Sequence, residues 1–225
     1  EPVDFILLNP TNSETVVPGI EIANLQDLPV ITVDRKSSRE DLVMSHVASD
    51  NLAGGRMAGE FVAAQLQGSG RVLEFEGIPG TSAAHERGTE FNEVISRYPD
   101  IEIIAREVAD FDRKKARTMT ERLLQKGLAV DAIFAHNDEM ILGVIEAFEA
   151  AEVPLPSVLV GFDATAEAVQ AVKQRKLTAT IAQRPEDMGW YAVYTAVQFL
   201  RGEQLSPVIF VDLELIEAQK ESPKE

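Results

Sequence analysis

The sequence is poor in cysteine, aromatic residues and positive charge. Its 225 residues include no cysteine, one tryptophan and only 6% aromatic residues. The absence of cysteine excludes disulfides, thiolate metal sites and cysteine nucleophiles. Lys and Arg number 21 against 37 Asp and Glu, which gives a formal net charge of −16. Because nucleic acids and anionic membranes are bound mainly through Lys and Arg, this charge argues against both kinds of partner.

Long apolar runs are also missing. No stretch approaches the roughly 18 apolar residues of a transmembrane helix. The opening residues, Glu1-Pro2-Val3-Asp4, lack the basic and apolar regions of a signal peptide, although a mature secreted chain would have lost such a segment. With 45% hydrophobic and 26% charged residues, the composition is that of a soluble globular protein of one or two domains.

The chain instead contains a regular alternation of short β-branched runs and amphipathic stretches. This alternation predicts right-handed βαβ units, mainly parallel sheets and therefore an α/β fold. Strands are expected at residues 3–8, 30–33, 45–48, 71–76, 101–108, 132–135, 158–162, 177–182 and 209–215. Helices are expected at residues 17–25, 50–66, 83–98, 113–126, 138–151, 166–174 and 186–201. The polar tail from residue 218 onward has no period, and we expect it to fray.

Polar residues follow several of the expected strands. The carboxyl ends of parallel strands form the binding edge of a sheet, so such residues indicate a ligand site. They are Asn9, Asp34, Arg35, Ser49, Asp50, Asp110, Asp112, Asn137, Asp138, Asp163 and Gln183. An alternative for Asp50, Asp112 and Asp138 is that each only caps a helix. Arg35, Arg87, Phe111 and Gln183 are not capping residues, and they favour a site.

Motifs for nucleotide chemistry are not found. Gly68-Ser69-Gly70 lacks the third glycine of a dinucleotide fingerprint and precedes a strand rather than following one. No lysine of the Walker type follows a glycine-rich loop. Gly55 and Gly59 lie at helical spacing, which predicts close packing of that helix on a neighbour. We therefore expect no cofactor.

Metal and catalytic motifs are equally unsupported. His46, His85 and His136 lie far apart in the sequence, whereas a metal site needs convergent ligands. Ser49 and Ser82 follow strands, but neither stands in the G-x-S-x-G pattern of a nucleophile elbow. The sequence predicts no metal site, no catalytic residue and no enzyme.

The polar edge suits a neutral sugar. Sugar hydroxyls both donate and accept hydrogen bonds, so carboxylates, amides and guanidinium groups are suitable partners. Phe111 and Phe162, both near strand ends, could wall the apolar face of a sugar ring. Two arginines and two aspartates would leave little net charge around an uncharged ligand.

Eight segments resemble the bacterial periplasmic ribose-binding proteins. They are LLNPTNS at 7–13, ITVDR at 31–35, SHVASDN at 45–51, GTSAAHERG at 80–88, ADFDR at 109–113, FAHNDEM at 134–140, VGFD at 160–163 and ATIAQ at 179–183. The resemblance extends from residue 3 to about residue 216, in order and with matching spacing. It implies a type I periplasmic-binding-protein fold with two Rossmann-like lobes joined by three crossover strands.

The resemblance also implies where the lobes lie and what they bind. Lobe one would comprise residues 1–49 and 184–212, lobe two residues 50–183 and 213–219, and residues 220–225 a disordered tail. D-ribose or a closely related monosaccharide would be clamped in the cleft between the lobes. Its contacts would be Asn9, Asp34, Arg35, Ser49, Arg87, Phe111, Asn137, Phe162, Asp163 and Gln183.

The family has two further βα units before the first strand seen here. Lobe one is therefore expected to be incomplete, with residues 3–8 forming an exposed edge strand. The partners implied are an ABC permease and a chemoreceptor. The location implied is the periplasm, or a lipid anchor outside the cell where there is no outer membrane. Two alternatives remain: the effector domain of a sugar-responsive repressor, and a sugar-processing enzyme.

Overall fold

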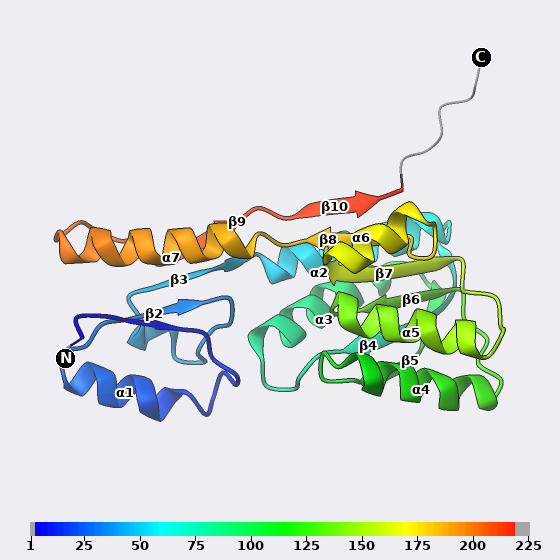
Figure 1. Ribbon diagram of the computed structural model, residues 1–225, viewed down its shortest axis with the longest axis horizontal. Helices are drawn as coiled ribbons and strands as arrows, with labels where there is room; N and C mark the ends of the chain where they lie inside the picture. The colour runs from blue at the N-terminus through cyan, green and yellow to red at the C-terminus, as the bar shows by residue number, and fades with distance from the viewer. Residues whose placement is uncertain (1–2, 219–225) are drawn as a thin grey trace, which may run out of the picture. The chain divides into compact units, whose positions relative to one another are not determined.

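A computed structural model describes residues 3–218 and divides them into two compact units (Figure 1). Unit 1 comprises residues 3–51, Gly80–Glu86 and Gln183–Leu213. Unit 2 comprises Leu52–Pro79, Arg87–Ala182 and residues 214–218. The lobe boundaries expected from the sequence differ by one or two residues at 49/50, 183/184 and 212/213, and Gly80–Glu86 was expected in the other lobe. The expected tail at 220–225 lies outside the described residues.

Unit 1 is built on a parallel four-stranded sheet in the order β1-β2-β3-β9. The strands are β1 (Ile6–Leu8), β2 (Val30–Val33), β3 (Ser45–Ser49) and β9 (Val208–Val211). Helices α1 (Val17–Leu25) and α7 (Pro185–Leu200) cover opposite faces of this sheet (Figure 1), and η1 (Glu40–Leu42) is a short 3₁₀ turn. Successive side chains of β2 point to opposite faces, so Ile31 packs in the α7 cluster and Val30 in the α1 cluster.

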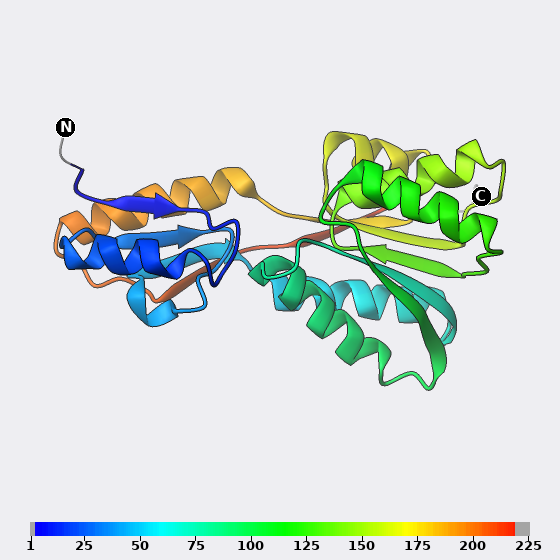
Figure 2. The ribbon, with the colours of Figure 1, turned by 90° about the horizontal axis from the view of Figure 1, so that it is seen from below.

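Unit 2 is built on a six-stranded sheet in the order β10-β8-β7-β6-β4-β5, in which only β10 is antiparallel to its neighbour. The strands are β4 (Ser69–Glu76), β5 (Asp100–Val108), β6 (Ala132–Ala135), β7 (Val158–Asp163), β8 (Ala179–Ala182) and β10 (Glu214–Glu217). The helices are α2 (Asn51–Gln65), α3 (Ser82–Ile95), α4 (Arg113–Gln125), α5 (Asp138–Ala150) and α6 (Ala166–Lys173), although Asn51 of α2 and the first residues of α3, up to Glu86, belong to unit 1. In Figure 2, α2 and α3 lie on one face of the sheet and α4, α5 and α6 on the other.

The close packing expected at the two helix glycines is confirmed. A Cβ at Gly55 would lie 2.3 Å from the carbonyl oxygen of Arg87, and one at Gly59 would lie 2.8 Å from the Cβ of Val94. Both contacts are to α3, and real Cβ atoms do not approach so closely. The two glycines of α2 therefore allow α3, which carries Arg87, to pack closely against α2.

Two expected strands differ from the structure. Residues 209–215 were expected to form one strand, but β9 pairs in parallel with β3 in the unit 1 sheet and β10 pairs antiparallel with β8 in the unit 2 sheet. The chain passes from unit 1 to unit 2 between Leu213 and Glu214, which ends one ladder and begins another. The first strand is also shorter than residues 3–8, because its partner β2 begins at Val30, opposite Ile6.

Strand β1 lies at the edge of its sheet, as expected. It pairs with β2 alone among the described strands, and Leu7 on it is 43% exposed. An edge of this kind carries backbone groups that can pair with another strand.

His46 is a buried titratable group in unit 1. It lies on β3, is 3% exposed, and its Nδ1 lies 2.9 Å from the Thr32 hydroxyl. Burial, assisted by the positive charge of Lys36, lowers the pKa of His46 from 6.5 to about 4. The folded protein therefore binds this proton less well than the unfolded chain.

This difference predicts a loss of stability in acid. The contribution of neutral His46 is fully present above pH 6.5 and is lost as the pH falls through about 4. At about 1.4 kcal/mol per pKa unit, the loss is about 3 kcal/mol. Urea unfolding of His46→Asn between pH 7 and 4 should give a flatter profile than that of the unaltered protein. The exposed His85, changed to Asn, serves as control, and an equal flattening there would contradict the assignment.

Candidate functional site

In unit 1, three of the predicted site residues lie together at the carboxyl ends of β1 and β2. Asn9 Nδ2 donates a hydrogen bond to Asp34 Oδ2 at 3.1 Å, and Arg35 Nε lies 3.9 Å from the same oxygen. Asp34 has a φ of 65°, in the left-handed region. We refer to Asn9, Asp34 and Arg35 as the unit 1 cluster. Its side chains are exposed or half-buried, so their polar groups can reach a ligand.

Ser49 and Gln183 come from the carboxyl ends of two other strands. Ser49 ends β3, and its buried hydroxyl oxygen has no hydrogen-bond partner within residues 3–218. A buried hydroxyl left in this way is uncommon and is compatible with a ligand contact. Gln183 follows β8 directly and is half-buried.

In unit 2, Arg87 is the centre of a second group. The residue is 3% exposed, and its guanidinium NH1 donates to the His136 carbonyl oxygen at 2.6 Å. The same nitrogen lies 3.8 Å from Asp163 Oδ1, and the guanidinium carbon lies 3.7 Å from the centre of the Phe162 ring. The cation is thus held by a carbonyl, a carboxylate and an aromatic face, and Phe162 is itself fully buried.

Phe111 and Asn137 complete this group. Phe111 has a φ of 60°, is half-buried and packs against the core of unit 2. Its ring is so close to Gly77 that a Cβ there would lie 2.1 Å from Cζ. Asn137 Nδ2 lies 3.4 Å from the Phe111 carbonyl oxygen. We refer to Arg87, Phe111, Asn137, Phe162 and Asp163 as the unit 2 cluster.

The capping alternative is confirmed for Asp112 and is wrong for Asp138. Asp112 Oδ1 accepts from the Lys115 amide at 2.7 Å and caps α4. At α5 the cap is Asn137, whose Oδ1 accepts from the Met140 amide, whereas Asp138 lies inside the helix. Asn137 therefore has a structural function in addition to any contact with a ligand.

Asp138 is instead part of a buried network. Its Oδ1 accepts from the Thr180 hydroxyl and its Oδ2 from the Thr165 amide, both at 2.7 Å. The Thr180 oxygen in turn lies 3.2 Å from the Ala164 amide. Burial, with a contribution from the charge of Asp163, raises the pKa of Asp138 to about 7. This carboxylate holds the turn that carries Asp163, where Asp163 and Ala164 both have positive φ.

The sequence did not predict the roles of three buried residues beside the unit 2 cluster. Asp138 was considered only as a helix cap, and the pairing of Glu74 with His136 was not predicted. Glu74 Oε1 lies 2.9 Å from His136 Nε2, and both side chains are buried. A signal was present, because Glu74 is a charged residue inside a strand whose neighbours Leu73 and Phe75 are apolar. Such a charge in a buried strand requires a partner.

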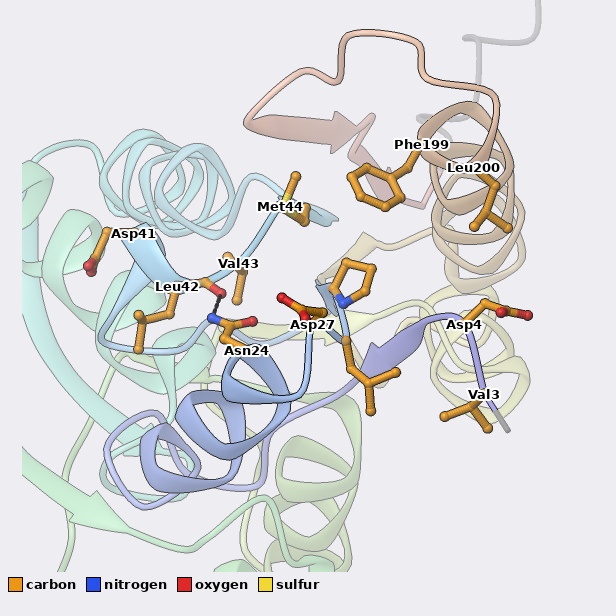
Figure 3. Close-up of a pocket in the computed structure, with 12 residues that line it drawn as sticks. Val3, Asp4, Asn24, Asp27, Asp41, Leu42, Val43, Met44, Phe199 and Leu200 are labelled. Atoms are coloured by element: carbon orange, nitrogen blue, oxygen red, sulfur yellow. Dashed lines mark hydrogen bonds between the residues drawn. The ribbon is translucent and has the colours of Figure 1, made fainter. Parts of the chain in front are cut away.

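A pocket of about 540 Å³ in unit 1 does not coincide with these residues (Figure 3). It lies at the amino ends of β1, β2 and β3, and its lining includes Asp4, Asn24, Met44 and Phe199. Asn24 Nδ2 donates to the Leu42 carbonyl oxygen at 2.8 Å across one wall. The predicted site residues of unit 1 follow the opposite, carboxyl ends of these strands, and none of them lines this pocket.

Comparison with known proteins assigns the family. Residues 1–204 match the family described as periplasmic binding protein domain. The chain belongs to this family. This periplasmic binding protein is 47% identical over 212 residues to a protein of Haemophilus influenzae named ribose import binding protein RbsB. That alignment covers 94% of the chain and 71% of the relative. The protein of the same name from Bacillus subtilis is 41% identical over 218 residues, with 97% and 70% covered.

Solved structures of family members have the same fold. A solute-binding protein of an ABC transporter from Bacillus halodurans, with bound myo-inositol, superposes with a TM-score of 0.91 at 30% identity and covers 96% of this chain and 75% of its own. A counterpart from Actinobacillus succinogenes with bound D-allose gives 0.87 at 27% identity, covering 96% and 77%. These relatives give no support to the repressor alternative. Within residues 3–218, no helix has the length and apolar character needed to cross a membrane.

The raised pKa of Asp138 predicts a loss of stability with rising pH. The protonated form is favoured in the folded state, so its contribution is full below pH 3.8 and is lost as the pH rises through about 7. The difference in pKa between the folded and unfolded states corresponds to a loss of roughly 4 kcal/mol in the free energy of unfolding. Asp138→Asn should lack this step in urea unfolding followed from pH 5 to 8.5. Asp112→Asn is the matched control, since asparagine also caps helices well and should keep the step; a step that survives in Asp138→Asn would contradict the assignment.

Proposed function

We propose that this periplasmic binding protein is the sugar-binding component of an ABC importer and binds D-ribose or a closely related monosaccharide. The observation that carries the proposal is the immobilised Arg87 guanidinium, with Asp163 and Asn137 beside it and Phe111 close by. A fixed fork of donors next to acceptors and an aromatic ring matches the hydroxyls and apolar face of a sugar. The unit 1 cluster supplies the same chemistry through Asn9, Asp34 and Arg35.

We propose ribose rather than another sugar on the basis of the names of the relatives. The two relatives named as ribose import binding proteins are 47% and 41% identical to the chain, whereas the myo-inositol and D-allose proteins are 30% and 27% identical. The ten predicted contacts remain proposals at the level of each residue. Titration with ribose, allose, arabinose and myo-inositol by calorimetry tests the choice, and tight binding of another sugar in preference to ribose would overturn it.

The proposal includes a periplasmic location, with an ABC permease and a chemoreceptor as partners. Binding without chemical turnover is part of the proposal, because the cluster geometry serves recognition of hydroxyl groups. Incubation with ribose followed by chromatography tests this part. Recovery of ribose unchanged supports a binding protein, and formation of a product would support the enzyme alternative.

Arg87→Ala should weaken ribose binding by at least about tenfold. Hydrogen bonds to a charged group contribute about 1.5–3 kcal/mol each, and about 1.4 kcal/mol corresponds to a factor of ten. Calorimetric titration of the folded variant measures the loss. Arg97→Ala is the control, because Arg97 is an exposed residue paired with Glu93 in the turn after α3. Unchanged affinity in Arg87→Ala would show that Arg87 does not contact the ligand.

The two phenylalanines of the unit 2 cluster should behave differently. Phe162 is fully buried, so Phe162→Ala should lower the free energy of unfolding by about 3–5 kcal/mol. Phe111 is half-buried, so Phe111→Ala should mainly reduce ribose affinity and lower the melting temperature much less. Thermal unfolding without ligand and calorimetric titration separate the two effects. An equally large loss of stability in Phe111→Ala, with unchanged affinity, would make Phe111 a core residue.

A further inference from the structure

Next to the unit 2 cluster lies a buried acid–imidazole pair, Glu74 and His136, which is linked to the cluster through His136. Glu74 on β4 is 0% exposed and His136, directly after β6, is 1% exposed. Glu74 Oε1 and His136 Nε2 are 2.9 Å apart. Burying such groups is costly unless each is fully paired, so their retention calls for a specific reason.

The hydrogen bonds of His136 define its tautomer. The Gly77 amide lies 3.3 Å from His136 Nδ1, and an amide N–H can only donate. Nδ1 is therefore the acceptor, and the ring proton is on Nε2, from which it is donated to Glu74. The carboxylate of Glu74 thus fixes both the tautomer and the orientation of the imidazole.

Glu74 is itself anchored from two neighbouring elements. Its Oε2 accepts from Asn92 Nδ2 on α3 at 3.0 Å and lies 3.3 Å from Arg106 Nε on β5. Asn92 also donates to the Gly88 carbonyl oxygen at 2.6 Å, and its own oxygen accepts from Arg106. The charge of Glu74 is therefore balanced, and its position is set by α3 and β5 together.

Three members of the unit 2 cluster depend on where His136 lies. Its carbonyl oxygen accepts the 2.6 Å hydrogen bond from Arg87, and Asn137 is the next residue in the chain. Its Nδ1 holds Gly77, against which the Phe111 ring packs with no room for a Cβ. One imidazole is thus connected to the guanidinium, the amide and the aromatic ring of the cluster.

We propose that Glu74 and His136 form a positioning pair that orients Arg87, Asn137 and Phe111 for the ligand. The inference rests on the proposed sugar-binding function and adds two residues that do not touch the sugar. Because buried ion-paired groups often add little net stability, an apolar pair could fill the same space. What an apolar pair could not supply is the directional bond to Gly77 and the fixed orientation of the ring.

The first measurement needs no ligand. Nitrogen-15 NMR of the imidazoles in the full chain should show His136 as the neutral tautomer with the proton on Nε2. In Glu74→Gln that signature should change, and the Gly77 amide should exchange its hydrogen faster. Glu102→Gln, an exposed acid on β5, is the matched control and should change neither readout. A proton on Nδ1 in the unaltered protein would overturn the proposal.

The second measurement is ribose affinity. Glu74→Gln should weaken binding about tenfold, and should weaken it much less when Arg87 is already alanine, because the pair acts through Arg87. His136→Phe, which fills the space of the imidazole but cannot accept from the Gly77 amide, is the second variant in case Glu74→Gln does not fold, and it should also weaken binding. Additive losses in the double variant, or a lower melting temperature with unchanged affinity, would show a merely structural pair.

The two levels of the proposal fail separately. If the unaltered protein binds no ribose or related sugar, the proposed function is wrong, and the tautomer and Gly77 exchange still decide whether Glu74 orients His136. If ribose binds, and the Glu74→Gln and His136→Phe variants bind it as tightly as the unaltered protein does, the function stands and the positioning pair is refuted.

Discussion

The guanidinium of Arg87 is a charge almost entirely removed from water, and much of the structure around it is required to keep it there. A buried cation without partners would cost several kcal/mol. Arg87 is compensated by the His136 carbonyl, the Asp163 carboxylate and the Phe162 ring. Its helix can approach the neighbouring helix because Gly55 has no side chain to meet the Arg87 carbonyl oxygen. Removing any one of these partners would leave the others to compensate the same charge.

The backbone at several strand ends adopts an unfavourable conformation. Asp34, Asp110, Phe111, Asp163 and Ala164 all have positive φ and all lie where a strand gives way to a loop. Non-glycine residues in this region cost on the order of 1–3 kcal/mol each unless their surroundings hold them. The Asp138 network supplies that support at Asp163 and Ala164. Strain of this kind is typical of sites where side chains must point in a particular direction, and three of the five residues, Asp34, Phe111 and Asp163, are predicted ligand contacts.

The alternation of strands and helices could be read from the sequence because local periodicity encodes it, and Asp112 was recognisable as a cap from its place before α4. The division of residues 209–215 into β9 and β10 could not, since an apolar run does not tell which sheet it joins. Glu74, His136 and Asp138 were missed for a related reason. The position of Glu74 between apolar strand residues signals a buried charge that needs a partner. The partners themselves, such as Asn92 for Glu74 and Thr180 for Asp138, are distant in sequence, so no local pattern identifies them.

The two clusters differ in how firmly they are held, and this difference bears on how a sugar would be bound. In unit 2 the donors and acceptors are fixed by buried networks, so little conformational entropy remains to be lost when a ligand binds. In unit 1 the Asn9 amide is exposed, and its side-chain bond goes to Asp34, which is itself half-buried. Ordering the unit 1 side chains when a ligand binds would cost conformational entropy. In unit 2 the corresponding entropy has already been lost on folding. Under the proposed function, selectivity among sugars should therefore follow the geometry of the unit 2 cluster, where a misplaced hydroxyl would leave a buried polar group unpaired. The unit 1 cluster should tolerate more variation in the hydroxyls that it is proposed to contact.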